Sequence, residues 1–133
     1  MNFNKITDHY VVSEQITIND ISQIKNAGFK TIICHRPDGE SDDQPSHKIL
    51  EETARSLELN FFYQPISPGQ FNNLLFQDFE MVCKSAPAPI FAFCRTGTRS
   101  ATIWALSQKG KLSDDEILSK TRSAGYDLSQ LFV

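Results

Sequence analysis

The chain has 133 residues, of which 40% are apolar and 22% charged, and its net charge is −3. These values are typical of one globular domain that can bury a core without disulfides or a metal. They exclude a strongly basic protein that would bind nucleic acid or anionic membranes through its overall charge, and no apolar run reaches the roughly 18 residues that span a bilayer.

Strands and helices alternate along the chain. Short apolar, β-prone segments predict strands at residues 10–12, 30–34, 60–63 and 90–93. Apolar residues at helical spacing predict helices at residues 19–27, 46–57, 72–85, 100–109 and 113–124, and residues 127–133 add a last turn. Ser113, with Glu116 three residues later, forms a capping box for the last of these helices. This alternation predicts a single α/β domain over residues 1–133, with a mostly parallel central sheet flanked by helices.

Two polar segments follow predicted strands directly. Cys94 comes after the strand at 90–93, and the segment 35–38 comes after the strand at 30–34. In open parallel sheets, ligands bind beyond the carboxyl ends of the strands. We therefore expect both segments to face one crevice.

Residues 94–100, with the sequence CRTGTRS, form the most informative stretch. A cysteine reacts as its thiolate, which is favoured at a helix N-terminus and beside guanidinium groups such as those of Arg95 and Arg99. Gly97 allows successive amides to turn inward as an anion nest. Hydroxyl groups that could bond the loop carbonyls or the sulfur complete the stretch: Thr96, Thr98 and Ser100. The alternative is a buried structural cysteine, which two arginines and a glycine in the following turn disfavour, so we predict that Cys94 is a catalytic nucleophile.

The remaining candidates give weaker signals. Cys34 and Cys83 lie among apolar residues and are predicted to belong to the core. Arg36 and Asp38 are either parts of an ordinary turn or a support for the anion-binding loop, and the sequence leaves both open. Neither a disulfide framework nor a metal site is expected from three cysteines and three scattered histidines. The start of the chain lacks the apolar core of a signal peptide, so we expect a cytoplasmic protein.

Most of the chain resembles a known family, through the stretches 12–16, 27–33, 36–40 and 94–100. It is similar to the bacterial phosphatase-like domain found fused to β-lactamase-like hydrolases, a divergent branch of the protein tyrosine and dual-specificity phosphatase superfamily. The resemblance implies a protein tyrosine phosphatase-like fold, no cofactor, and a small-molecule or phosphorylated substrate. It also implies that Cys94 accepts a phosphoryl group, that the loop amides and Arg99 hold its oxygens, and that Ser100 assists release.

The sequence departs from the phosphatase pattern at three places. Arg99 lies five positions after Cys94, where the phosphatase signature has six, and Phe93 replaces the usual histidine. The loop 64–69, which corresponds to the segment that normally carries the general acid, contains no acidic residue. Without a general acid, only esters with good leaving groups are expected to be cleaved well. Nothing in the sequence selects among the carboxylates that could substitute: Asp38, Glu40, Asp42 and Asp78.

The shorter loop also resembles that of rhodaneses, sulfurtransferases with the pattern Cys-Arg-x-Gly-x-Arg, which residues 94–99 match. That resemblance implies a persulfide on Cys94 and requires no general acid, although the rest of the chain looks like the phosphatase branch. A third possibility is an anion-binding module that turns over poorly. The physiological substrate and the oligomeric state are left open.

Overall fold

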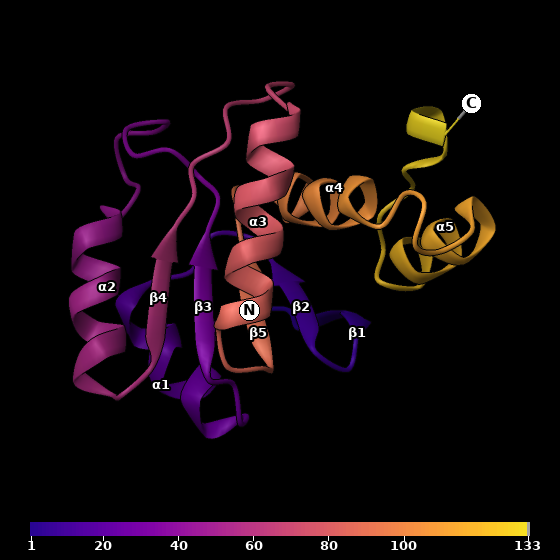
Figure 1. The fold of residues 1–133 in the computed structure, drawn as a ribbon. Coiled ribbons are helices and arrows are strands. Elements are labelled where there is room, and N and C mark those ends of the chain that lie inside the picture. The colour runs from indigo at the N-terminus through magenta and orange to yellow at the C-terminus, as the bar shows by residue number, and fades with distance from the viewer. Residues whose placement is uncertain (133) are drawn as a thin grey trace.

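The computed structural model describes residues 1–132. The strands are β1 (Asn4–Thr7), β2 (Tyr10–Ser13), β3 (Thr31–Cys34), β4 (Asn60–Tyr63) and β5 (Ile90–Phe93). The helices are α1 (Ile18–Asn26), α2 (His47–Ser56), α3 (Asn73–Ser85), α4 (Thr98–Ser107) and α5 (Asp114–Ser123), followed by a 3-10 turn, η1 (Ser129–Phe132). Figure 1 shows them as an α/β fold around one sheet, as the sequence predicts.

The five strands form one sheet in the order β1-β2-β5-β3-β4. Strands β2, β5, β3 and β4 are parallel, and only β1 is antiparallel to its neighbour. The prediction of a mostly parallel sheet is therefore confirmed. Strand β1, an edge strand with Ile6 as its one buried residue, was not predicted from the sequence. A strand with so little buried surface carries no apolar pattern, and only its pairing with β2 reveals it.

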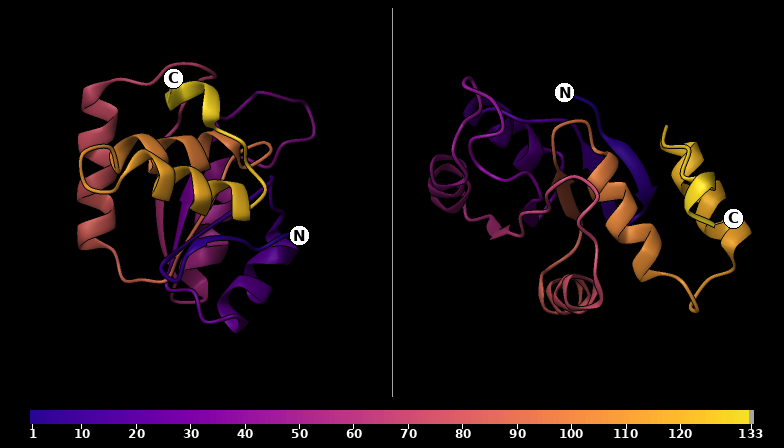
Figure 2. Two further views of the ribbon diagram at one scale, coloured as in Figure 1. Left: turned by 90° about the vertical axis from the view of Figure 1, so that its right-hand side faces the viewer. Right: turned by 90° about the horizontal axis from the view of Figure 1, so that it is seen from above.

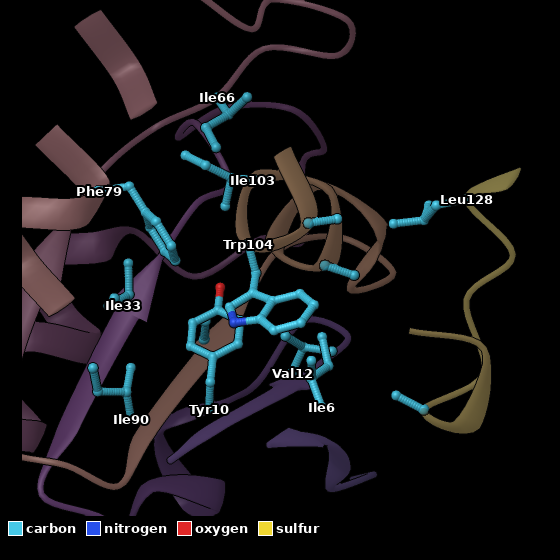
Figure 3. Close-up of a cluster of buried hydrophobic side chains, with 14 of the residues drawn as sticks. Ile6, Tyr10, Val12, Ile33, Ile66, Phe79, Ile90, Ile103, Trp104 and Leu128 are labelled. Carbon is cyan, nitrogen blue, oxygen red and sulfur yellow. The ribbon is translucent and has the colours of Figure 1, made fainter. Parts of the chain in front are cut away.

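Alternate residues of the central strands point to opposite faces of the sheet and feed two apolar clusters. On one face, Ile32 and Phe91 pack with α1 and α2. On the other face, Ile33 and Ala92 pack with α3, α4 and α5. Figure 2 shows helices on both sides of the sheet, and Figure 3 shows part of the second cluster, with Trp104 between the sheet and Leu128.

Most of the helices begin at a polar residue that binds a backbone amide. The side chains of Ser46, Asn72 and Ser113 accept hydrogen bonds from the first turns of α2, α3 and α5. Of the predicted capping box, the Ser113 half is present, with the Glu116 amide donating to the Ser113 hydroxyl over 3.2 Å. The Glu116 carboxylate accepts from that same hydroxyl and not from the Ser113 backbone amide, so the reciprocal bond of a capping box is not formed. Helix α4 begins at Thr98, and the residue at its N-cap position is Gly97, whose φ of 96° lies in the left-handed region. Since glycine has no side chain, it cannot cap α4 in this way.

The parallel arrangement brings the carboxyl ends of four strands to one edge of the sheet. There, residues 14–16 follow β2, residues 94–97 follow β5, residues 35–46 follow β3 and residues 64–72 follow β4. The crevice expected from the sequence is formed by these segments. Within the described residues, no helix is long and apolar enough to cross a membrane.

Candidate active site

Cys94 lies at the floor of the loop between β5 and α4. Its sulfur accepts a hydrogen bond from the Gly97 amide over 3.1 Å, so the chain closes around it within three residues. The residue is only 1% exposed, yet it belongs to neither apolar cluster. The polar groups at this sulfur are the Gly97 amide and the nearby Arg99 guanidinium, and these two contacts favour a role in binding negative charge over that of a purely structural cysteine.

The guanidinium of Arg99 is fixed by two acceptors at the rim of this loop. It donates to both carboxylate oxygens of Glu40, over 2.8 and 2.9 Å, and to the Ile66 carbonyl over 2.8 Å. Glu40 raises the pKa of Arg99, and the nearby Cys94 sulfur also favours its charged form. The contacts with Glu40 and Ile66 hold the planar guanidinium of Arg99 in one orientation. An anion that binds there therefore costs less side-chain entropy than it would at a mobile arginine.

Glu40 bridges two arginines, because it also accepts from Arg36 Nε over 3.0 Å. Arg36 is 5% exposed and donates further to Gln15 Oε1 and Ser41 Oγ. The guanidiniums of Arg99 and then Arg36 hold the pKa of the Glu40 carboxyl below its ordinary value. Glu40 is therefore a carboxylate at neutral pH and cannot supply a proton to a leaving group.

A buried chain of hydrogen bonds lies behind the loop. His35 Nδ1 is 2.7 Å from Ser100 Oγ, and His35 Nε2 is 3.2 Å from Gln64 Oε1. The Gln64 amide nitrogen donates to the Leu75 carbonyl, so its oxygen faces His35 and the proton of the imidazole lies on Nε2. Nδ1 then accepts from the Ser100 hydroxyl. The chain thus fixes the hydroxyl of Ser100 on His35.

Burial lowers the pKa of His35 to about 3, so the ring is neutral throughout the physiological range. Ser100 is itself fully buried, and its carbonyl accepts from the Tyr10 hydroxyl over 2.8 Å. The structure therefore places Ser100 in contact with His35 and Tyr10. Its role in the release of an intermediate stays a prediction.

Tyr126, from the segment after α5, closes over the outer side of the loop. Its hydroxyl donates to the Thr96 carbonyl over 3.1 Å and accepts from the Asn4 amide over 3.0 Å. Thr96 and Thr98 contact each other through their hydroxyls, 3.0 Å apart. Strand β1 and the segment after α5 therefore both contribute to the outer side of the Cys94 loop.

Arg95 is the one member of the predicted loop whose side chain is left without a polar partner among residues 1–132. Its carbonyl accepts from the Gln15 amide, whereas its guanidinium makes no hydrogen bond or ion pair within this range. The side chain lines two open cavities. One, of about 390 Å³, is also lined by Arg36, Glu40, Ser41, Pro68 and Arg99. The other, of about 430 Å³, is lined by Gln15, Thr17, Arg36, Ser41, Asp43, Gln44 and Pro45.

The structure gives Arg36 and Asp38 different positions. Arg36 supports the loop by way of Glu40, which favours the supporting role that the sequence left open. Asp38 instead binds His47, whose Nδ1 lies 2.5 Å from its carboxylate, and lines neither cavity. Its part as a proton donor is therefore not favoured by the geometry.

Sequence reasoning did not identify several of the contacts around Cys94. Glu40 was considered only as a proton donor, and Gln64 and Tyr126 were not assigned to the site at all. The spacing of Arg36 and Glu40 is a weak signal for their ion pair, but nothing near residue 126 indicates a contact with residue 96. Across the described part of the chain, no group of three or more metal-ligating side chains is found.

The amino-acid sequence of this chain matches a known protein family. Residues 2–111 match the family described as beta-lactamase hydrolase-like protein, phosphatase-like domain. A beta-lactamase hydrolase-like protein of Agrobacterium fabrum is 28% identical over 126 residues, which are 93% of this chain and 29% of that protein. Its counterpart in Xylella fastidiosa is 25% identical over 127 residues, 94% of this chain and 30% of that protein. The chain thus spans about three tenths of the length of these relatives.

Solved structures are similar over almost the whole chain. A candidate phosphatase of Neisseria meningitidis superimposes with a TM-score of 0.87 and 31% identity, covering 96% of this chain and 91% of that chain. Tk-PTP in its active form, with a TM-score of 0.70 and 16% identity over 96% of this chain and 88% of its own, shares the fold. So does the core catalytic domain of the PP-IP phosphatase SIW14 of S. cerevisiae, with a TM-score of 0.69 and 16% identity over 99% and 83% of the two chains.

Proposed function

Because this chain belongs to the family of phosphatase-like domains of beta-lactamase hydrolase-like proteins, we propose that it hydrolyses phosphate monoesters through a phosphocysteine on Cys94. The observation that carries the proposal is the sulfur held by the Gly97 amide beside the oriented guanidinium of Arg99. Both groups favour negative charge at one point, which is what a thiolate and a phosphoryl group require.

In the first step the Cys94 thiolate attacks phosphorus, the S–P bond forms, and the bond from phosphorus to the leaving oxygen breaks. Arg99 and the amides of the loop stabilise the charge on the non-bridging oxygens. The leaving oxygen departs with its electron pair and takes a proton from water. In the second step water attacks phosphorus, the S–P bond breaks, and phosphate and the thiolate are released while the water proton passes to solvent.

The surrounding carboxylates limit the range of leaving groups. Glu40 is held ionised by two arginines, Asp38 is bound to His47, and the loop 64–69 has no acid. The departing oxygen must therefore be stable without protonation by the protein. We infer a strong preference for aryl phosphates over alkyl phosphates.

The ring formed by residues 94–99 supports a second candidate function, rhodanese-type sulfur transfer. This ring is one residue shorter than the phosphatase signature, and its sulfur is already contacted by the Gly97 amide. A smaller ring suits a single sulfane sulfur better than a phosphoryl group. The thiolate would attack the outer sulfur of thiosulfate, the S–S bond would break, sulfite would leave, and the persulfide would pass its sulfur to a thiol acceptor. No general acid is needed.

One experiment separates these functions. The protein is incubated with 4-nitrophenyl phosphate or with thiosulfate, and the mass of the adduct on Cys94 is determined together with the released phosphate or sulfite. A phosphoryl adduct with steady phosphate release supports hydrolysis, whereas a persulfide with sulfite release and no phosphoryl adduct overturns it in favour of sulfur transfer. Cys94→Ser must abolish either activity, and Cys83→Ser, on helix α3 and outside the Cys94 loop, is the control that keeps it.

Two further outcomes count against both enzymes. A phosphoryl adduct that forms once and is not released would identify the chain as an anion-binding module. Activity that survives in Cys94→Ser would remove Cys94 from the mechanism altogether.

A further inference from the structure

Arg95 differs from the other two arginines around the loop because its side chain has no polar partner among residues 1–132. Arg36 and Arg99 are tied to Glu40, and their positions are fixed by additional acceptors. The Arg95 side chain is exposed to solvent and makes no hydrogen bond or ion pair with any residue from 1 to 132. It is therefore free to bind an anion without breaking an existing contact.

The cavity beside Arg99 is strongly electropositive although the chain as a whole is acidic. Its lining contains the guanidiniums of Arg36, Arg95 and Arg99 and a single carboxylate, that of Glu40. Glu40 balances one of these three charges, so a net positive charge remains around about 390 Å³, and an oxyanion bound there would offset it. The net charge of −3 rules out a general attraction for anions, so this positive field is local.

The second cavity continues from the first, because Arg36, Ser41 and Arg95 line both. Its other lining residues are polar except Pro45, and the only carboxylate among them belongs to Asp43. Cavities of about 390 and 430 Å³ are of the size that holds small molecules. Arg95 lies at their junction.

We propose that this junction is a second anion subsite, and that the substrates are small phosphate monoesters carrying a further acidic group, which Arg95 binds while the phosphoryl group lies at Cys94. This inference rests on the proposed function for the identity of the reacting group. The acidic group can be a carboxylate or a second phosphate, because either accepts from a guanidinium in the same way. Arg95 then selects the substrate and Arg99 acts on the reacting group.

The test measures binding in the Cys94→Ser protein, where no turnover complicates it. By calorimetry, 3- and 4-carboxyphenyl phosphate are compared with the nearly isosteric 3- and 4-carbamoylphenyl phosphates, which lack the second charge. We expect at least one carboxylated ester to bind about ten-fold more tightly than its neutral counterpart. Adding Arg95→Gln should bring that ratio close to one, and Arg122→Gln, at an exposed arginine of α5 that lines neither cavity, should leave it at about ten.

Two results would overturn the subsite: equal affinities for charged and neutral esters at both ring positions, or a ratio that Arg95→Gln leaves unchanged. Phosphate release by the wild-type protein is measured separately with the same esters. If the affinity ratio follows Arg95 but no phosphate is released, the proposed hydrolysis fails and the anion subsite stands. If phosphate is released equally well from both esters at limiting concentration, the hydrolysis stands and the subsite fails.

Discussion

The phenol oxygen of Tyr126 occupies the space that a Cβ atom on residue 97 would need, and Gly97, directly before α4, has a positive φ of 96°. The two residues are 29 positions apart, yet each sets the conformation of the other. The hydroxyl can reach the Thr96 carbonyl only because Gly97 has no side chain. Tyr126 and Gly97 thus define the outer wall of the Cys94 loop together.

Gly97→Ala is expected to lower turnover of an aryl phosphate at least about ten-fold, because the new methyl group displaces Tyr126 and reopens the loop. Gly28→Ala is the matched control, since Gly28 has a φ of 98° and nothing within 4 Å of its added Cβ. Both variants should lose about 1 to 2 kcal/mol of stability from backbone strain, measured by denaturant unfolding. Equal activities of the two variants would contradict the role given to this contact.

Tyr126→Phe removes the hydrogen bonds to Thr96 and Asn4 while it keeps the ring in place. We expect a loss of about 1 kcal/mol in the free energy of unfolding. A positioning role predicts in addition a lower kcat with little change in KM, because the loop would lose its orientation more than its charge. If Tyr126→Phe loses stability but retains the wild-type kcat, Tyr126 contributes to stability only and does not position the loop.

Glu40→Gln tests whether the carboxylate orients Arg99. The amide keeps the size of the side chain but cannot accept from Arg99 through both terminal atoms, so kcat should fall about ten-fold or more. Removing a negative charge from the cavity also strengthens its attraction for anions, so KM should stay equal or fall. Glu51→Gln, at the exposed ion pair with Arg55 on α2, is the control and should change neither constant. A higher KM in Glu40→Gln would contradict this reading of the cavity.

His35 predicts a pH dependence of stability. The pKa of His35 is about 3 in the folded chain and about 6.5 in the unfolded chain. Between pH 6.5 and pH 3, the imidazole is therefore protonated in the unfolded chain but stays neutral in the folded chain. The free energy of unfolding should therefore decrease as the pH falls from about 6.5 toward 3, by up to about 1.4 kcal/mol per pH unit from this residue. His35→Asn retains an acceptor for Ser100 without an ionisable ring, and urea unfolding as a function of pH should show a shallower acid limb. An identical acid limb would mean that His35 is not buried as a neutral ring.

The three thiols are expected to differ in their reaction with iodoacetamide at pH 7.5. Burial raises the pKa of Cys34 and of Cys83 to about 12, so both stay protonated. The sulfur of Cys94, contacted by the Gly97 amide, should give the single adduct found by peptide mass analysis, and inorganic phosphate should slow its formation. Early modification of Cys34 or Cys83 in the folded protein would argue against this assignment.

The elements whose residues carry a strong local signal were predicted well. The strands at 60–63 and 90–93 have the predicted bounds, and α5 begins at its predicted cap, because apolar runs and capping residues act over a few neighbours. Helix α4 begins at Thr98, two residues before the predicted start. The loop of residues 94–97 leads directly into that helix, and Gly97 at the N-cap position lacks the side chain that gives the usual capping signal.

Local patterns in the amino-acid sequence were enough to predict the order of all the helices and of every strand except β1, and the rules of parallel sheets then placed Cys94 at the carboxyl end of a buried strand. Which side chains surround the sulfur depends on contacts between distant segments, which only the folded chain reveals. Glu40 reaches Arg99 across 59 positions, His35 reaches Ser100 across 65, and Asn4 reaches Tyr126 across 122. Such contacts depend on which strand ends lie side by side in the sheet. The spacing of residues along the sequence does not reveal which ends these are.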